Sequence, residues 1–215
     1  MRFPNAHKGV KKILIAEIFS IAAVVILLFG AVAALALAAL PSEADTAGIG
    51  VAAVAALFIG LGLAAASFII NLVGILQAKK DEYNFHYAFV FVIIPIIASV
   101  FAAIFSKNTY VQSIADAVRN VCEVAVMIFI IGGIRTLADK LGDDKTVNSS
   151  NLALRIITAV YGLLLLARVI EIVFDFLPMM LMTASILSVI AGVLNVVAHV
   201  YYFFFLGRAV KMLKK

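Results

Sequence analysis

Long runs of apolar residues, separated by short polar or proline-containing breaks, fill most of the sequence. A run of about 20 mostly apolar residues is long enough to cross a bilayer as a helix. The runs that reach this length are 13–40, 48–77, 86–106, 110–137, 153–177 and 179–207. The pattern predicts an all-α integral membrane bundle of six transmembrane helices, forming a single domain over residues 1–215.

Lysine and arginine are distributed unevenly among the breaks. Apart from Lys107, Arg119 and Arg168, all of the 17 basic residues fall in segments that an alternating topology places on one side of the membrane. Basic residues accumulate on the cytoplasmic side. Both termini are therefore predicted to be cytoplasmic, which agrees with an even number of spans.

The composition supports lipid as the solvent of this chain. Hydrophobic residues make up 65% of it and charged residues only 13%, whereas soluble domains are about 25% charged. The net charge of +5 follows the topology and does not indicate nucleic-acid binding. Cys122 is the single cysteine, so an intrachain disulfide is excluded.

A polar stripe interrupts the fourth apolar run near its middle. Spacings of three and four residues place its members on one helix face. The members are Asp116, Arg119, Asn120 and Glu123. Charge in hydrocarbon is costly, so it usually faces a bundle interior or an aqueous cavity. The stripe predicts a polar site within the membrane.

The fifth and sixth runs carry further polar residues at helical spacing. They are Arg168, Glu171 and Asp175 on the fifth run, and Asn195 and His199 on the sixth. The stripes of the fourth and fifth runs lie at similar predicted depth on antiparallel neighbours. This arrangement would bring Glu123 near Arg168 and Arg119 near Glu171.

Two interpretations of these stripes follow. The first is a water-accessible site for an ion, a proton or a polar solute, as in a small transport or channel-type protein. The second is an ion-pair network that only locks helices together, in a non-catalytic scaffold or an accessory subunit. An excess of carboxylates over arginines in the fourth and fifth runs favours the first, because unpaired carboxylates need protons, a cation or water.

Small residues recur every fourth position in the first two runs. They are Gly30, Ala34 and Ala38 in the first run, and Ala52, Ala56, Gly60 and Ala64 in the second. Small side chains let helix backbones approach closely. These faces are predicted to pack the first two helices against each other, or alternatively to dock another membrane subunit.

The residue types needed for catalysis or cofactor binding do not form a recognisable motif. HExxH, GxSxG, Walker, GxGxxG and CxxC patterns are absent from the sequence. We therefore expect no enzymatic activity, no cofactor and no metal site. Ser149, Ser150 or Asn151 is predicted to be the N-cap of the fifth helix.

Two segments carry a resemblance to uncharacterised bacterial multi-pass membrane proteins. The segments are 3–18, which contains Phe-Pro-Asn-Ala and Lys-Gly-Val-Lys-Lys-Ile, and 74–82, which reads Gly-Ile-Leu-Gln-Ala-Lys-Lys-Asp-Glu. The resemblance implies a bacterial plasma membrane and no particular activity. The spacing of Ala34 and Ala38 is also similar to the alanine docking motif of substrate-binding subunits of energy-coupling vitamin transporters.

Overall fold

A computed structural model describes residues 2–39, 47–106, 108–174 and 178–214 of the chain. Within these ranges, side chains are described except at positions 38, 39, 47, 109, 110, 167–174, 178–189, 191, 192 and 195.

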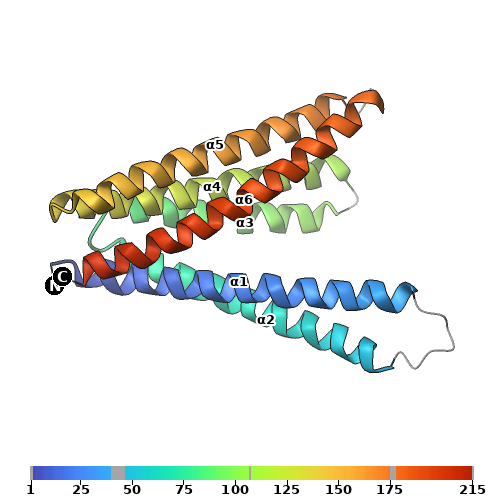
Figure 1. The fold of residues 1–215 in the computed structure, drawn as a ribbon, viewed down its shortest axis with the longest axis horizontal. Helices are drawn as coiled ribbons and strands as arrows, with labels where there is room; N and C mark the ends of the chain where they lie inside the picture. The colour runs from blue at the N-terminus through green and yellow to red at the C-terminus, as the bar shows by residue number, and fades with distance from the viewer. Residues whose placement is uncertain (1, 40–46, 107, 175–177, 215) are drawn as a thin grey trace. The chain divides into compact units, whose positions relative to one another are not determined.

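Six helices make up the described chain (Figure 1). In chain order they are α1 (Pro4–Ala39), α2 (Ala47–Ala78), α3 (Asn84–Ile104), α4 (Thr109–Lys140), α5 (Asp144–Phe174) and α6 (Pro178–Leu213). Each is long and apolar enough to span a membrane. The described residues include no strand, and the predicted all-α arrangement of six apolar helices is confirmed.

A tight turn connects α4 to α5. Gly142 adopts a φ of 67°, a conformation that glycine tolerates because it has no Cβ. The N–H groups of Gly142 and Asp143 donate to the carbonyls of Asp139 and Ala138 at 3.0 Å each, which is a Schellman ending for α4. Because the next helix starts at once, α4 and α5 are antiparallel neighbours.

The cap of α5 differs from the prediction. Asp143 is the N-cap, and its Oδ1 accepts the backbone N–H of Thr146 at 3.3 Å. The predicted cap at Ser149, Ser150 or Asn151 is wrong, because all three lie inside the helix. The buried Ser150 hydroxyl donates instead to the Thr146 carbonyl at 2.8 Å. A capping aspartate thus extends the helix into a polar segment well before the apolar run begins.

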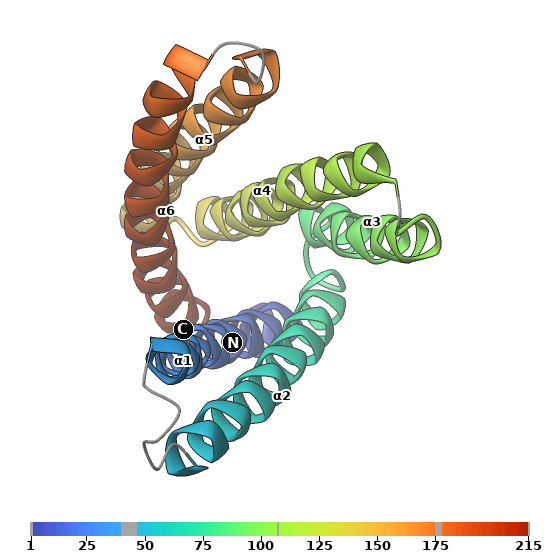
Figure 2. The same cartoon turned by 90° about the vertical axis from the view of Figure 1, so that its right-hand side faces the viewer.

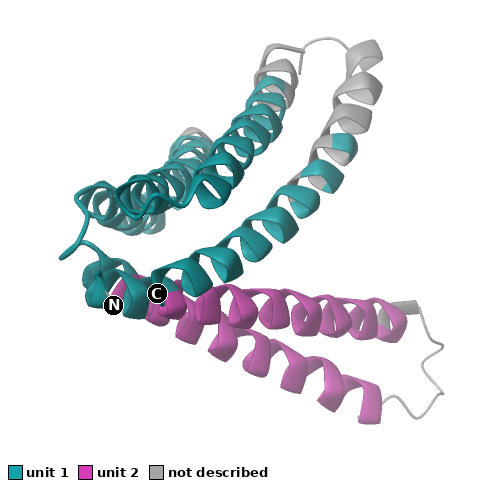
Figure 3. Cartoon of the chain, turned by 60° about the vertical axis from the view of Figure 1, so that its left-hand side comes forward, with its two compact units in different colours: residues 1–10, 75–215 teal, residues 11–74 magenta. Residues whose placement is uncertain are grey.

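The chain divides into two compact units, drawn in Figure 3. Unit 1 contains residues 1–10 and 75–215, and unit 2 contains residues 11–74. Unit 2 is therefore the hairpin formed by most of α1 and α2, and unit 1 holds α3 to α6 together with the first turns of α1 and the last turn of α2. The prediction that the chain is a single six-helix domain stays a prediction.

Close backbone approach holds the hairpin of unit 2 together. A Cβ added to Gly30 would lie 3.0 Å from the Cβ of Ala56, and one added to Gly60 would lie 2.6 Å from Leu27. The Ser67 hydroxyl donates to the Ala16 carbonyl at 2.8 Å. In lipid such packing and hydrogen bonds replace the hydrophobic drive between helices.

Only part of the predicted small-residue face lies in this contact. Gly30, Ala56 and Gly60 are shielded, whereas Ala34, Ala52 and Ala64 are exposed; the side chain of Ala38 lies outside the described ones. A step of four residues turns about 40° beyond a full helical turn, so a strict four-residue stripe leaves the contact. The shielded positions of α2 alternate steps of three and four: Ala53, Ala56, Gly60, Leu63 and Ser67.

Unit 1 is built from two helical hairpins, α3 with α4 and α5 with α6, joined by packing of α4 on α5 (Figure 2). Its buried core gathers at the end that holds both termini. The α6 positions in this core again recur at steps of three and four: Ala198, Tyr202, Phe205, Ala209 and Met212. This period is typical of left-handed helix packing.

We predict that Gly60→Leu destabilises the hairpin by about 1–3 kcal/mol, because the new side chain must displace Leu27 from a close contact. Thermal unfolding in detergent measures the effect. Gly62→Leu is the matched control, since a Cβ at Gly62 meets nothing within 4 Å. Equal stability of the two variants would show that the Gly60 contact is absent.

Candidate functional site

The polar stripe of α4 lies in the middle of a membrane-length helix and is largely open. Side-chain exposure is 64% for Asp116 and 54% for Arg119, and 50% for Glu123. Asn120 is exposed as well. The charges are therefore not sealed inside the described part of the bundle, and a charge in the middle of a membrane-spanning helix needs water or a polar partner.

Glu123 meets the sixth helix. Its Oε1 lies 3.7 Å from Nε2 of His199, whose side chain is 30% exposed. This separation is within ion-pair range but too long for a hydrogen bond. The sequence analysis proposed Glu123 and His199 for one site. The structure brings them together from α4 and α6, which are far apart in the chain.

Arg119 points toward Asp116 and α3. Its Nη1 lies 3.3 Å from Asp116 Oδ1 one turn away, and its Nη2 lies 3.5 Å from the Ser99 hydroxyl of α3. Such an exposed pair within one helix contributes only a few tenths of a kcal/mol. Further from Glu123, the Gln112 side chain donates to the Ala102 carbonyl of α3 at 2.7 Å. The stripe therefore runs along the α3–α4 contact and reaches α6 at Glu123.

The remaining predicted site residues cannot be placed in this cluster. Arg168 and Glu171 lie on α5 and Asn195 lies on α6, but their side chains fall outside the described ones. Asp175 lies outside the described residues altogether. The predicted approaches of Glu123 to Arg168 and of Arg119 to Glu171 stay predictions.

A second polar cluster, at the end that holds both termini, was not singled out from the sequence. The Asp81 carboxylate accepts the Asn5 side-chain amide at 2.9 Å and the Ala6 backbone N–H at 2.7 Å. It thereby satisfies donors in the first turn of α1, where negative charge is favourable. The Arg2 guanidinium also donates to the Lys140 carbonyl at 3.1 Å.

The neighbouring carboxylate is buried and paired. Glu82 is 8% exposed, and its Oε2 accepts a hydrogen bond from Lys140 Nζ at 2.7 Å. The Asn84 amide adds a contact to Glu82 Oε1 at 3.2 Å. The signal in the sequence was Lys-Lys-Asp-Glu in the α2–α3 connection, which was treated only as a topology marker. This cluster connects the start of α1, the α2–α3 connection and the end of α4 at one end of unit 1.

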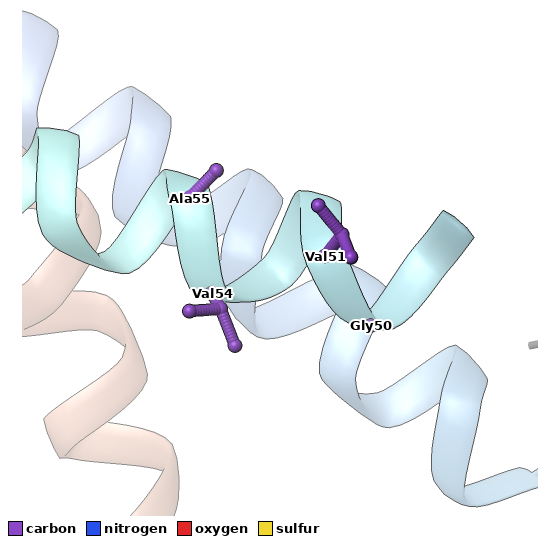
Figure 4. Close-up of a pocket in the computed structure, with 4 residues that line it drawn as sticks. All are labelled: Gly50, Val51, Val54 and Ala55. Carbon is purple, nitrogen blue, oxygen red and sulfur yellow. The ribbon is translucent and has the colours of Figure 1, made fainter. Parts of the chain in front are cut away.

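The structure also contains an apolar hollow of about 500 Å³ on α2, far from either polar cluster in sequence (Figure 4). Gly50, Val51, Val54 and Ala55 line it. Its lining side chains are apolar, so it offers no group that would orient a polar ligand.

The donor set limits the chemistry of the α4 stripe. Within the described chain, no group of three or more His, Cys, Asp or Glu side chains could hold a metal ion. A carboxylate facing an imidazole can instead hold a proton or pair with an ion. Comparison of the chain with protein-family models, curated proteins and solved structures finds no match.

We predict that Glu123 and His199 are energetically coupled. In a double-mutant cycle of Glu123→Gln and His199→Gln, the coupling energy is expected to be about 0.6 kcal/mol, the typical value for polar contacts between membrane helices. Unfolding in detergent supplies the four stabilities. The control cycle pairs Glu123→Gln with His86→Gln, which should be additive because His86 lies in the first turn of α3. Additivity in both cycles would contradict the contact.

Proposed function

We propose that this protein is a small transport or channel-type membrane protein that handles an ion or a polar solute at the α4 stripe. The observation that carries the proposal is the exposure of Asp116, Arg119 and Glu123 at half or more of their side-chain surface near mid-helix. Facing lipid, such charges would be costly. A hydrated path beside α4 removes that cost and gives the charges a role.

The distribution of packing supports this proposal. Buried side chains such as Ile130, Ile134 and Leu137 of α4 lie toward the end that holds the termini, where Glu82 and Lys140 pair. A tightly packed end and a polar, half-exposed middle would give unit 1 a barrier next to an accessible site. Transport requires both, because an unobstructed pore would leak.

A second candidate is a non-catalytic scaffold or an accessory subunit, including a substrate-binding subunit of a larger transporter. The pairing of Arg119 with Asp116 favours it, since a neutralised pair can serve packing alone. The exposed small residues Ala34, Ala52 and Ala64 also leave room for a neighbouring membrane helix. Neither candidate includes a catalysed reaction.

We further propose that the protein resides in the plasma membrane of a bacterium with both termini in the cytoplasm. The bias of basic residues supports the orientation. The contact of Arg2 with Lys140 and that of Arg208 with Ser149 place both ends of the chain at one end of unit 1, as this topology requires.

Water access to the stripe is the direct test of the first candidate. In a Cys122→Ala background, a cysteine at Asn120 or Glu123 is expected to react with a charged thiol reagent in intact vesicles about tenfold faster than one at Val121, because charged reagents do not enter hydrocarbon. Val121 is the matched control, being 48% exposed at the same depth and on a different helix face. Equal slow rates from both sides of the membrane would support the scaffold.

The proposed orientation of the chain in the membrane is tested separately. A single cysteine at Lys145, in the same Cys122→Ala background, should be labelled by an impermeant reagent only after the cells are opened, because the α4–α5 turn is proposed to be cytoplasmic. A cysteine at Ser42, between the first two apolar runs, should be labelled in intact cells and serves as the control. Labelling of position 145 from outside would reverse the orientation.

A further inference from the structure

Glu123 and His199 form a contact between α4 and α6, in addition to the packing of α4 on α5 that joins the two hairpins of unit 1. Helices α3 and α4 pack extensively, as do α5 and α6, but α4 touches α6 only narrowly. The Glu123–His199 pair, at 3.7 Å, spans this narrow contact. A change in its charge therefore acts on a contact between α4 and α6 that has little other packing around it.

Among the described side chains of the polar stripe and its α6 partner, the charges sum to one uncompensated negative charge. On α4, Asp116 and Arg119 neutralise each other at 3.3 Å, which leaves the Glu123 carboxylate. A neutral His199 does not compensate it. One proton bound to the pair removes the net charge, and this is favourable because an uncompensated charge is costly at this depth.

Among the described side chains, those of the other helices that pack on α4 and α6 do not change this balance. The stretch of α3 from Ala88 to Ile104 holds no titratable residue. The other titratable residues of α6 before its basic end are Tyr201 and Tyr202, which add no formal charge to the count. On α5, Tyr161 donates to the Met127 sulfur; the side chains of Arg168 and Glu171 lie outside the described ones, and Asp175 lies outside the described residues.

The chemistry of the pair favours a proton over a metal ion. Structural and catalytic zinc sites use three or four protein ligands, and this contact supplies two. Imidazole is the side chain whose charge changes between about pH 5 and 8. An imidazole beside a carboxylate, with both groups partly open, is suited to accept a proton from water and return it.

We propose that the Glu123–His199 pair is a proton-binding site and that the proton is the ion handled at the α4 stripe. The inference rests on the proposed transport function and names its ligand. Uptake forms one N–H bond at His199 with a proton from water, and release returns that proton to water. With the proton bound, imidazolium and carboxylate attract each other and hold α4 to α6; without it, the link loosens.

Histidine nitrogen resonances test the proposal in the full chain. Protein labelled with ¹⁵N at its three histidines, His7, His86 and His199, is reconstituted in lipid vesicles and titrated, and the His199→Gln variant assigns the His199 signals. The His199 ring is expected to convert between neutral and protonated forms within about pH 5–8. The substitution Glu123→Gln should change the proton affinity of the His199 ring about tenfold, because this is the effect of one close charge in a poorly hydrated setting.

Two variants control the measurement. Asp139→Asn removes an exposed carboxylate at the end of α4 and should leave the His199 titration unchanged. Glu123→Asp keeps the carboxylate and should retain most of the coupling. Unchanged His7 and His86 signals in every variant show that the fold is intact.

A His199 ring that stays in one form throughout the range, or a titration that Glu123→Gln leaves unchanged, would overturn the proton site. That outcome is separable from failure of the transport proposal. If cysteines at positions 120 and 123 react but the His199 titration does not depend on Glu123, the α4 stripe is a hydrated site and the proton is not its ligand. Unreactive cysteines would reject the site itself, whatever His199 does.

Discussion

The close approach of helix backbones is the interaction on which the described structure depends. Lipid is as apolar as leucine, so membrane helices gain little by burying apolar side chains against each other. They gain from contacts near enough for dispersion and occasional hydrogen bonds, as at Gly30 on Ala56, Gly60 on Leu27 and Gly133 on Phe85. Alternating three- and four-residue steps keep such contacts in register over several turns. The hairpins that result determine which polar side chains can meet.

Polar groups occupy two contrasting environments in unit 1. At the end that holds the termini, Asp81 and Glu82 are met by Asn5, Ala6 and Lys140 at hydrogen-bonding distance, and Glu82 is buried. Near the middle of α4, the charges are half exposed and their contacts are longer. The first arrangement is typical of polar groups that hold helices together. The second is typical of a site that stays accessible to a ligand. This contrast between neighbouring regions of one helix bundle supports a transport role more directly than the presence of charge alone.

The proposed proton site at Glu123 and His199 connects the polar stripe to the contact between α4 and α6. An ion pair adds little stability at half exposure, but α4 and α6 have few other contacts. At this pair a modest free energy is sufficient to alter the contact between α4 and α6, while the packing of α4 on α5 still joins the hairpins. A proton is suited to this role, since it alters the charge without requiring room.

The sequence by itself determined the six helices, their apolar character and the three- and four-residue stripe on α4, because helix formation in lipid depends on run length and composition. It also indicated close packing of α1 with α2 through Gly30, Ala56 and Gly60, but it assigned the period of that face wrongly. It placed the N-cap of α5 too late, because an aspartate directly after Gly142 can start a helix in a polar segment. The pairing of Glu123 with His199 and of Glu82 with Lys140 was decided only by tertiary structure. These residues lie far apart in the chain, and helices that are apolar on every side carry no amphipathic signal to show which face meets which neighbour.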